Sequence, residues 1–186
     1  MTADLELHTI SAYGYRLGGP GGWQLPGLQP AGQLRTAWYD ETNPTHQFVE
    51  RAGIRVKARL GLATPELSEL PWTFATATEV SPDDWTPETS APPPLSLQLP
   101  ADSQLRDVDR ALAEQFVLVI SESQVDRDEQ DLSYYDDDDD LAGFAHSQAG
   151  APTAEWDRTL MDALTMLGFE PDGLPRWLWY RQISRM

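Results

Sequence analysis

The chain has 186 residues and a formal net charge of −17, with 40 % hydrophobic residues, 7 tryptophans and no cysteine. The lack of cysteine excludes disulfides, thiolate metal sites and a cysteine nucleophile. The negative charge argues against direct binding to nucleic acid or to anionic membranes, because both need a basic surface. The length suits a single domain over 1–186, and the aromatic content is sufficient for a packed core.

The first hundred residues contain most of the proline and glycine, which predicts a strand-rich part rather than a helical bundle. A glycine-rich stretch at 18–22 is predicted to be a loop, since it lacks the spacing of phosphate-binding motifs. Residues 81–94 read as a proline-rich connector. The strands predicted in this part span residues 5–13, 34–39, 54–62, 72–80 and 95–99.

The clearest alternation of apolar and polar residues lies at 54–62. Ile54, Val56 and the apolar residues that follow at every second position would point one way, while Arg55 and Lys57 would point the other. One buried and one wet face is typical of a strand in an antiparallel sheet.

Residues 101–186 change in character and predict a helix, a strand, an acidic loop, a second helix and a final strand. Thr153 suits the N-cap of the second helix and Gly168 its end. The fold class expected is therefore α+β, with a mostly antiparallel sheet of about 6–7 strands and two amphipathic helices in the C-terminal half. The segments predicted here are the helices 104–115 and 153–167 and the strands 116–120 and 177–183.

The strongest compositional feature is the acidic stretch 122–140, which holds ten carboxylates and one base, Arg127, directly after the apolar strand 116–120. It could be a docking surface for a basic protein partner, a site for a divalent cation, or a solvated loop. Adjacent aspartates in an extended chain alternate sides, and the EF-hand spacing fails at Asp131 and Asp137, so neither a metal site nor a cofactor is predicted. The partner-binding residues expected from the docking interpretation are Asp126, Asp128, Glu129, Asp131, Asp136, Asp137, Asp138, Asp139 and Asp140.

Trp177 and Trp179 fall on one side of the last predicted strand, whereas Leu178 and Tyr180 fall on the other. Large apolar residues on both sides indicate either core packing or an interface with a partner or with another copy of the chain. The two tryptophans are therefore candidate interface residues, and a homo-oligomer is a possibility.

No grouping of residues indicates a catalytic site. The histidines His8, His46 and His146 are scattered, and no GxSxG motif is present, so no catalytic residue is predicted. His146, which lies beside Ser147, is the best placed of the three to act as an acid or base.

Three functions remain open at this point. The leading hypothesis is a non-enzymatic acidic protein-binding module, an inhibitor, immunity-type protein or adaptor, that docks on a basic protein. The alternatives are a structural subunit of a phage or bacterial assembly, and a divalent-metal-dependent enzyme that uses the acidic loop. We expect neither a signal peptide nor a membrane span, and the lack of cysteine is compatible with a cytoplasmic protein.

Overall fold

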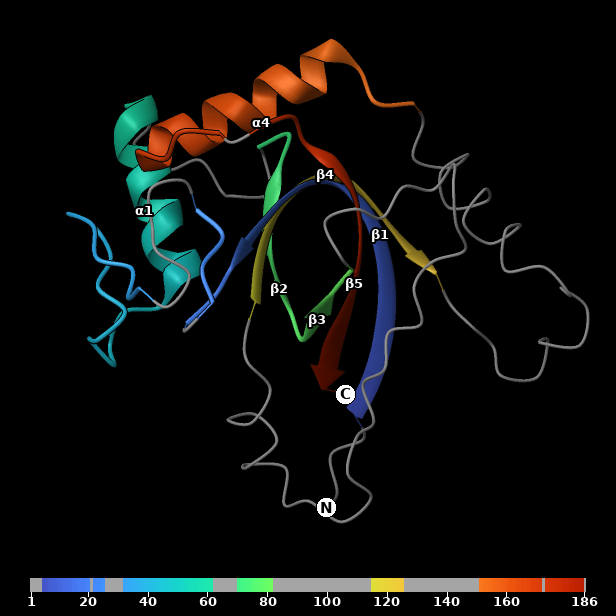
Figure 1. Ribbon diagram of the computed structural model, residues 1–186, viewed down its shortest axis with the longest axis horizontal. Helices are drawn as coiled ribbons and strands as arrows, with labels where there is room; N and C mark the ends of the chain where they lie inside the picture. Colours follow the sequence, from blue (N-terminus) through green and yellow to red (C-terminus); the bar gives the residue numbers. More distant parts are fainter. Residues whose placement is uncertain are drawn as a thin grey trace, which may run out of the picture.

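The computed structural model describes residues 5–20, 22–25, 32–61, 70–81, 115–125, 151–171 and 173–185. These residues form an antiparallel sheet with two helices, so the α+β class is confirmed (Figure 1). The predicted strand 95–99 and nearly all of the predicted helix 104–115 and of the connector 81–94 lie outside the described residues. The last residue of that predicted helix, Gln115, is the first residue of a strand.

The described strands are paired in the order β2-β4-β1-β5-β3, and every pairing is antiparallel. The predicted strand 116–120 lies within β4, which pairs with neighbours on both sides, as its continuous apolar run indicates. The strand bounds are β1 (Leu5–Gly18), β2 (Thr73–Ala77), β3 (Glu79–Val80), β4 (Gln115–Val125) and β5 (Arg176–Arg185).

The sheet closes on itself through β2 and β3. These strands stand at opposite ends of the strand order, yet only Thr78 separates them in the chain. The Thr78 N–H donates to the carbonyl oxygen of Arg181 on β5 at 2.8 Å, which continues the pairing round the corner. β2 and β3 are therefore two halves of one bent strand, and four chain segments build the sheet. The prediction of about 6–7 strands is wrong for the described residues.

Two irregularities and one glycine let β1 bend against β4. Between Ser11 and Tyr13 the register shifts because β4 carries an extra residue there, and Ser121 at that point has a φ of 58°. Further along β1, a Cβ on Gly14 would lie 2.0 Å from the carbonyl oxygen of Leu118. Only glycine permits this approach of the two backbones.

The inner face of the closed sheet is a small core of its own, with side chains that are at most 7 % exposed. Most of them are alanine or valine, which leave room for the opposite sides of the sheet to meet. The members of this inner cluster are Ile10, Ala12, Ala75, Ala77, Val80, Val117, Val119, Leu178 and Tyr180.

The other face is covered by α1 (Phe48–Leu60), α4 (Ala154–Leu167) and the segments at 23–25 and 34–39. Figure 1 shows both helices on the same side of the sheet, one crossing the end of the other. This outer cluster is aromatic: Phe48 lies 4.7 Å from Phe116 and 5.0 Å from Trp23, measured between ring centroids.

The helix α1 corrects the prediction of a strand at 54–62. Its buried residues include Phe48, Ala52 and Val56, which recur every four residues and so lie on one helix face. Ile54, which the alternating pattern placed inside, is 53 % exposed. The helix begins six residues before position 54, and over its whole length the buried residues follow the helical period and not the alternation. The helix ends at Gly61, which has a left-handed φ of 65°.

The prediction of a helix at 153–167 is confirmed, whereas the prediction of a strand at 34–39 is wrong. α4 confirms the predicted helix: the Thr153 side chain accepts a hydrogen bond from the Trp156 N–H, and Gly168 ends the helix with a φ of 88°. The segment 34–39 is not a strand, because its pairing is limited to an isolated bridge between Arg35 and Asp40. The two described helices thus come one from each half of the chain, rather than both from the C-terminal half.

Candidate functional site

The residues predicted to bind a basic partner, Asp126 to Asp140, lie outside the described residues. What the structure describes is the frame on either side of them. β4 ends at Val125, which pairs with Thr9, and the chain is described again from Ala151, shortly before α4. The acidic stretch therefore begins within β4, and residues 126–150 connect that strand to the segment before α4.

The predicted interface tryptophans both contact the interior of this chain. Trp177 is half-buried and packs edge-on against Tyr13 at 5.6 Å, while Trp179 is 5 % exposed. Leu178 and Tyr180 point into the inner cluster, so the predicted alternation of sides along this strand is correct. The proposed interface role of the two tryptophans stays a prediction.

The first carboxylate of the acidic stretch has a defined position. Glu122 follows the bulge at Ser121 on β4, is itself exposed, and accepts a hydrogen bond of 2.5 Å from the Tyr180 hydroxyl. Burial of Tyr180, and then the nearby negative charge of Glu122, raise the pKa of this phenol well above its ordinary value. The bulge therefore places the Glu122 carboxylate at the end of the inner cluster, where it accepts a hydrogen bond from the one tyrosine hydroxyl of that cluster.

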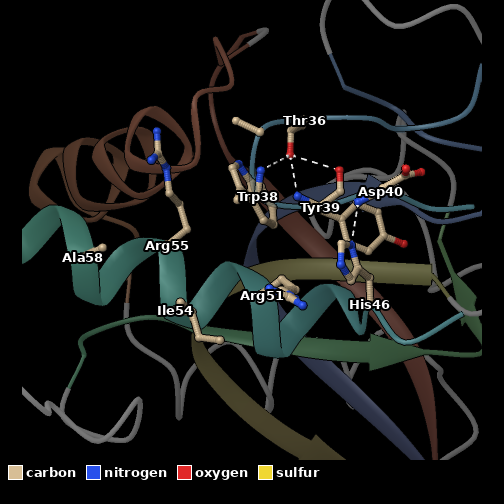
Figure 2. A pocket seen from close by; sticks show the side chains of 10 residues that line it. Thr36, Trp38, Tyr39, Asp40, His46, Arg51, Ile54, Arg55 and Ala58 are labelled. Atoms are coloured by element: carbon tan, nitrogen blue, oxygen red, sulfur yellow. Dashed lines mark hydrogen bonds between the residues drawn. The ribbon is translucent and has the colours of Figure 1, made fainter. Parts of the chain in front are cut away.

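A second feature is a pocket of about 360 Å³ between α1 and the loop that precedes it (Figure 2). It combines cationic, aromatic and aliphatic side chains from two chain segments. The lining residues are Thr36, Ala37, Trp38, Tyr39, Asp40, His46, Arg51, Ile54, Arg55 and Ala58.

Hydrogen bonds within the loop hold the wall of this pocket. The Thr36 hydroxyl oxygen accepts bonds from the backbone N–H groups of Trp38 at 3.3 Å and Tyr39 at 2.9 Å (Figure 2). The Trp38 indole N–H donates to the carbonyl oxygen of Leu167 at the end of α4, at 2.9 Å. The position of the indole is thus determined by both its own loop and α4.

His46 and Asp40 are oriented by local hydrogen bonds as well. The Asp40 N–H donates to Nδ1 of His46 at 3.1 Å, so the proton of the neutral imidazole is on Nε2. The Asp40 carboxylate is bonded to the hydroxyl of Thr42 and then to its backbone N–H, and these bonds, together with Arg35, lower the pKa of Asp40. The carboxylate of Asp40 is therefore already bonded within the loop, whereas Nε2 of His46 can act as a donor.

The helix α1 contributes the positive charge of the pocket. It carries Arg51, Arg55, Lys57 and Arg59 against a single carboxylate, Glu50. Arg51 and Arg55 are four residues apart and share one helix face. This site was not predicted from the sequence, because a strand at 54–62 would not place Arg55 on the same face as Arg51. The helical spacing of Phe48, Ala52 and Val56 is the signal that predicts the correct element.

Other kinds of site find no support among the described residues. No group of three or more histidine, aspartate or glutamate side chains there is arranged to hold a metal ion. In the same part of the chain, no helix is long and apolar enough to cross a membrane. His146, the best placed histidine in the sequence, lies outside the described residues.

Comparison with known proteins gives no assignment. No family model matches the chain, and searches of curated proteins and of solved structures found no match either.

Proposed function

We propose that the protein is a non-enzymatic acidic binding module that docks on a basic protein partner. The observation that carries this proposal is the concentration of ten carboxylates and one base in residues 122–140, which begin at the end of the central strand β4 and precede α4 in the chain. Such a density of negative charge speeds association with a positive surface and makes the association sensitive to salt.

The described surface is compatible with this docking mode. On α4, Glu155 and Asp162 are exposed, and the last turn of the helix contains no basic residue. Glu122 and Glu170 are exposed too. These carboxylates add to the net negative charge of the chain, while the docking contact itself is assigned to residues 122–140. An inhibitor, an immunity-type protein and an adaptor all fit this physical description.

The test is capture of a partner from the native host at low salt, followed by binding of the purified partner. Replacement of Asp137 to Asp140 by asparagine removes four negative charges from the acidic stretch. We expect this variant to bind at least about tenfold more weakly at low salt, with a smaller dependence of affinity on salt.

A matched control removes the same charge elsewhere. The substitutions Glu50→Gln, Glu155→Gln, Asp162→Asn and Glu170→Gln all lie at exposed positions. If this control weakens binding as much as the asparagine variant, net charge and not the acidic stretch governs the affinity. If neither variant changes the affinity, or if the wild-type complex is insensitive to salt, the proposal is wrong.

A further inference from the structure

The pocket beside α1 is lined by two cations, Arg51 and Arg55, and by one carboxylate, Asp40, which is already bonded to Thr42 and paired with Arg35. Within the described part of the chain, neither Arg51 nor Arg55 forms an ion pair, although both line the pocket. His46 uses Nδ1 as the acceptor for the Asp40 N–H, which leaves the Nε2 proton for another partner. Arg51 and His46 lie next to each other in Figure 2.

Arg55 adds an independent observation. Its Nε atom is buried and has no hydrogen-bond partner. A buried donor without an acceptor is costly, and for a charged group the cost is higher still. Arg55 thus brings to the pocket wall a guanidinium group that no carboxylate among the described residues neutralises.

Part of the pocket wall is apolar, with Trp38, Ile54 and Ala58 among its lining residues. Trp38 is held in place by its bond to Leu167, and Ile54 is 53 % exposed at the pocket although it is a large aliphatic residue. An apolar surface next to a few fixed polar donors is the usual composition of a site for a small organic molecule. The volume of about 360 Å³ lies at the lower end of the range for such sites.

We propose that this pocket binds a small organic anion. Its carboxylate or phosphate group would accept hydrogen bonds from Arg51 and from Nε2 of His46, while its apolar or aromatic part would lie against Trp38 and Ile54. The positive charge of Arg55 would stabilise the bound anion. Arginine is suited to this role because its planar guanidinium can bond two oxygens of an oxyanion at once. None of the lining residues belongs to the acidic stretch, and the proposed binding does not require a protein partner.

The test uses isothermal titration calorimetry with phenyl phosphate, benzoate and inorganic phosphate. We expect saturable one-to-one binding of phenyl phosphate or benzoate, and at least about tenfold weaker binding of inorganic phosphate, which lacks the apolar part. Comparison of the first two ligands distinguishes a phosphate site from a carboxylate site. Failure of all three to saturate would overturn the proposal.

Variants of α1 locate the binding. Arg51→Gln should weaken binding at least about tenfold, because it removes a charged donor to the anion. Arg59→Gln is the matched control, since it removes the same charge from an exposed position of the same helix that does not line the pocket. Equal losses for the two variants would show that the anion is attracted by the net charge of α1, and the proposal would then be wrong.

A third variant tests the apolar half of the site. Trp38→Phe should weaken phenyl phosphate but leave the weak binding of inorganic phosphate unchanged within about twofold. We also expect ligand binding to change the tryptophan fluorescence of the wild type, and we expect this change to be absent in Trp38→Phe. If the substitution affects both ligands equally, the organic part of the ligand does not contact Trp38, and the assignment of an organic anion fails.

Discussion

The two faces of the sheet bury their side chains in different ways. On the inner face, alanine and valine predominate, and the sheet folds round so that its own opposite sides cover them. On the outer face, Trp23, Phe48 and Phe116 are too large for that arrangement, and two helices with their loops cover them. Side-chain size thus decides whether a sheet can cover itself or needs a second layer.

The inner face should be the less tolerant of added atoms. A Cβ on Gly14 would meet the Leu118 carbonyl oxygen at 2.0 Å and the Val119 Cα at 2.7 Å, both of them backbone atoms that cannot turn aside. We expect Gly14→Ala to lower the free energy of unfolding by at least about 4 kcal/mol, at the upper end for single substitutions. Urea denaturation measures this value.

The control for this prediction is Gly22→Ala. No atom lies within 4 Å of a Cβ at Gly22, and its φ is not in the left-handed region. We expect Gly22→Ala to change the free energy of unfolding of the protein by no more than about 0.5 kcal/mol. A loss at Gly14 as small as that at Gly22 would mean that β1 and β4 can move apart, and that the sheet is not closed as tightly as the distances indicate.

The faces should also differ in their response to a cavity. Leu178 in the inner cluster and Leu160 in the outer cluster are both 0 % exposed. Leu178→Ala should cost about 3 to 4 kcal/mol and Leu160→Ala about 2 to 3 kcal/mol, because a helix can shift to fill part of the space whereas a hydrogen-bonded closed sheet cannot. Denaturation of the two variants under identical conditions gives the comparison. A larger loss for Leu160→Ala would reverse the order of rigidity of the two faces.

The parts of the fold that could be predicted from the sequence are those whose determining residues lie close together in the chain. Thr153 and Gly168 cap the two ends of α4, and these caps and the apolar stripe between them could all be predicted from the sequence. Residues 72–80 were predicted as one strand, which agrees with β2 and β3 as a single bent segment. Closure of the sheet could not be predicted, since it depends on the corner at Thr78 meeting Arg181, more than a hundred residues away.

The candidate sites followed the same rule. The acidic stretch is a matter of composition and needs no fold to be recognised. The pocket joins Trp38 and His46 to Arg51 and Arg55, and a strand at 54–62 would have turned Arg55 away from Arg51. The pocket could therefore not be predicted once residues 54–62 were assigned the two-residue period of a strand, because the period determines the direction of each side chain.

The hydrogen bond between Tyr180 and Glu122 links the inner face to the start of the acidic stretch, and its effect should depend on pH. Tyr180→Phe removes the bond without leaving a buried group unsatisfied, since Glu122 is exposed, so we expect a loss of about 1 to 2 kcal/mol at pH 8.

The pKa of Tyr180 is raised in the folded protein. The stability that depends on its neutral form is therefore complete below the unfolded value of about 10 and is lost as the pH rises above it. The wild type should accordingly lose more stability between pH 8 and pH 11 than Tyr180→Phe does, and the difference between them should shrink by about 1 kcal/mol. Leu178→Ala, which retains the tyrosine, should instead stay a constant distance below the wild type over this range. Parallel pH profiles for the wild type and Tyr180→Phe would show that the phenol is not held neutral by its position in the inner cluster.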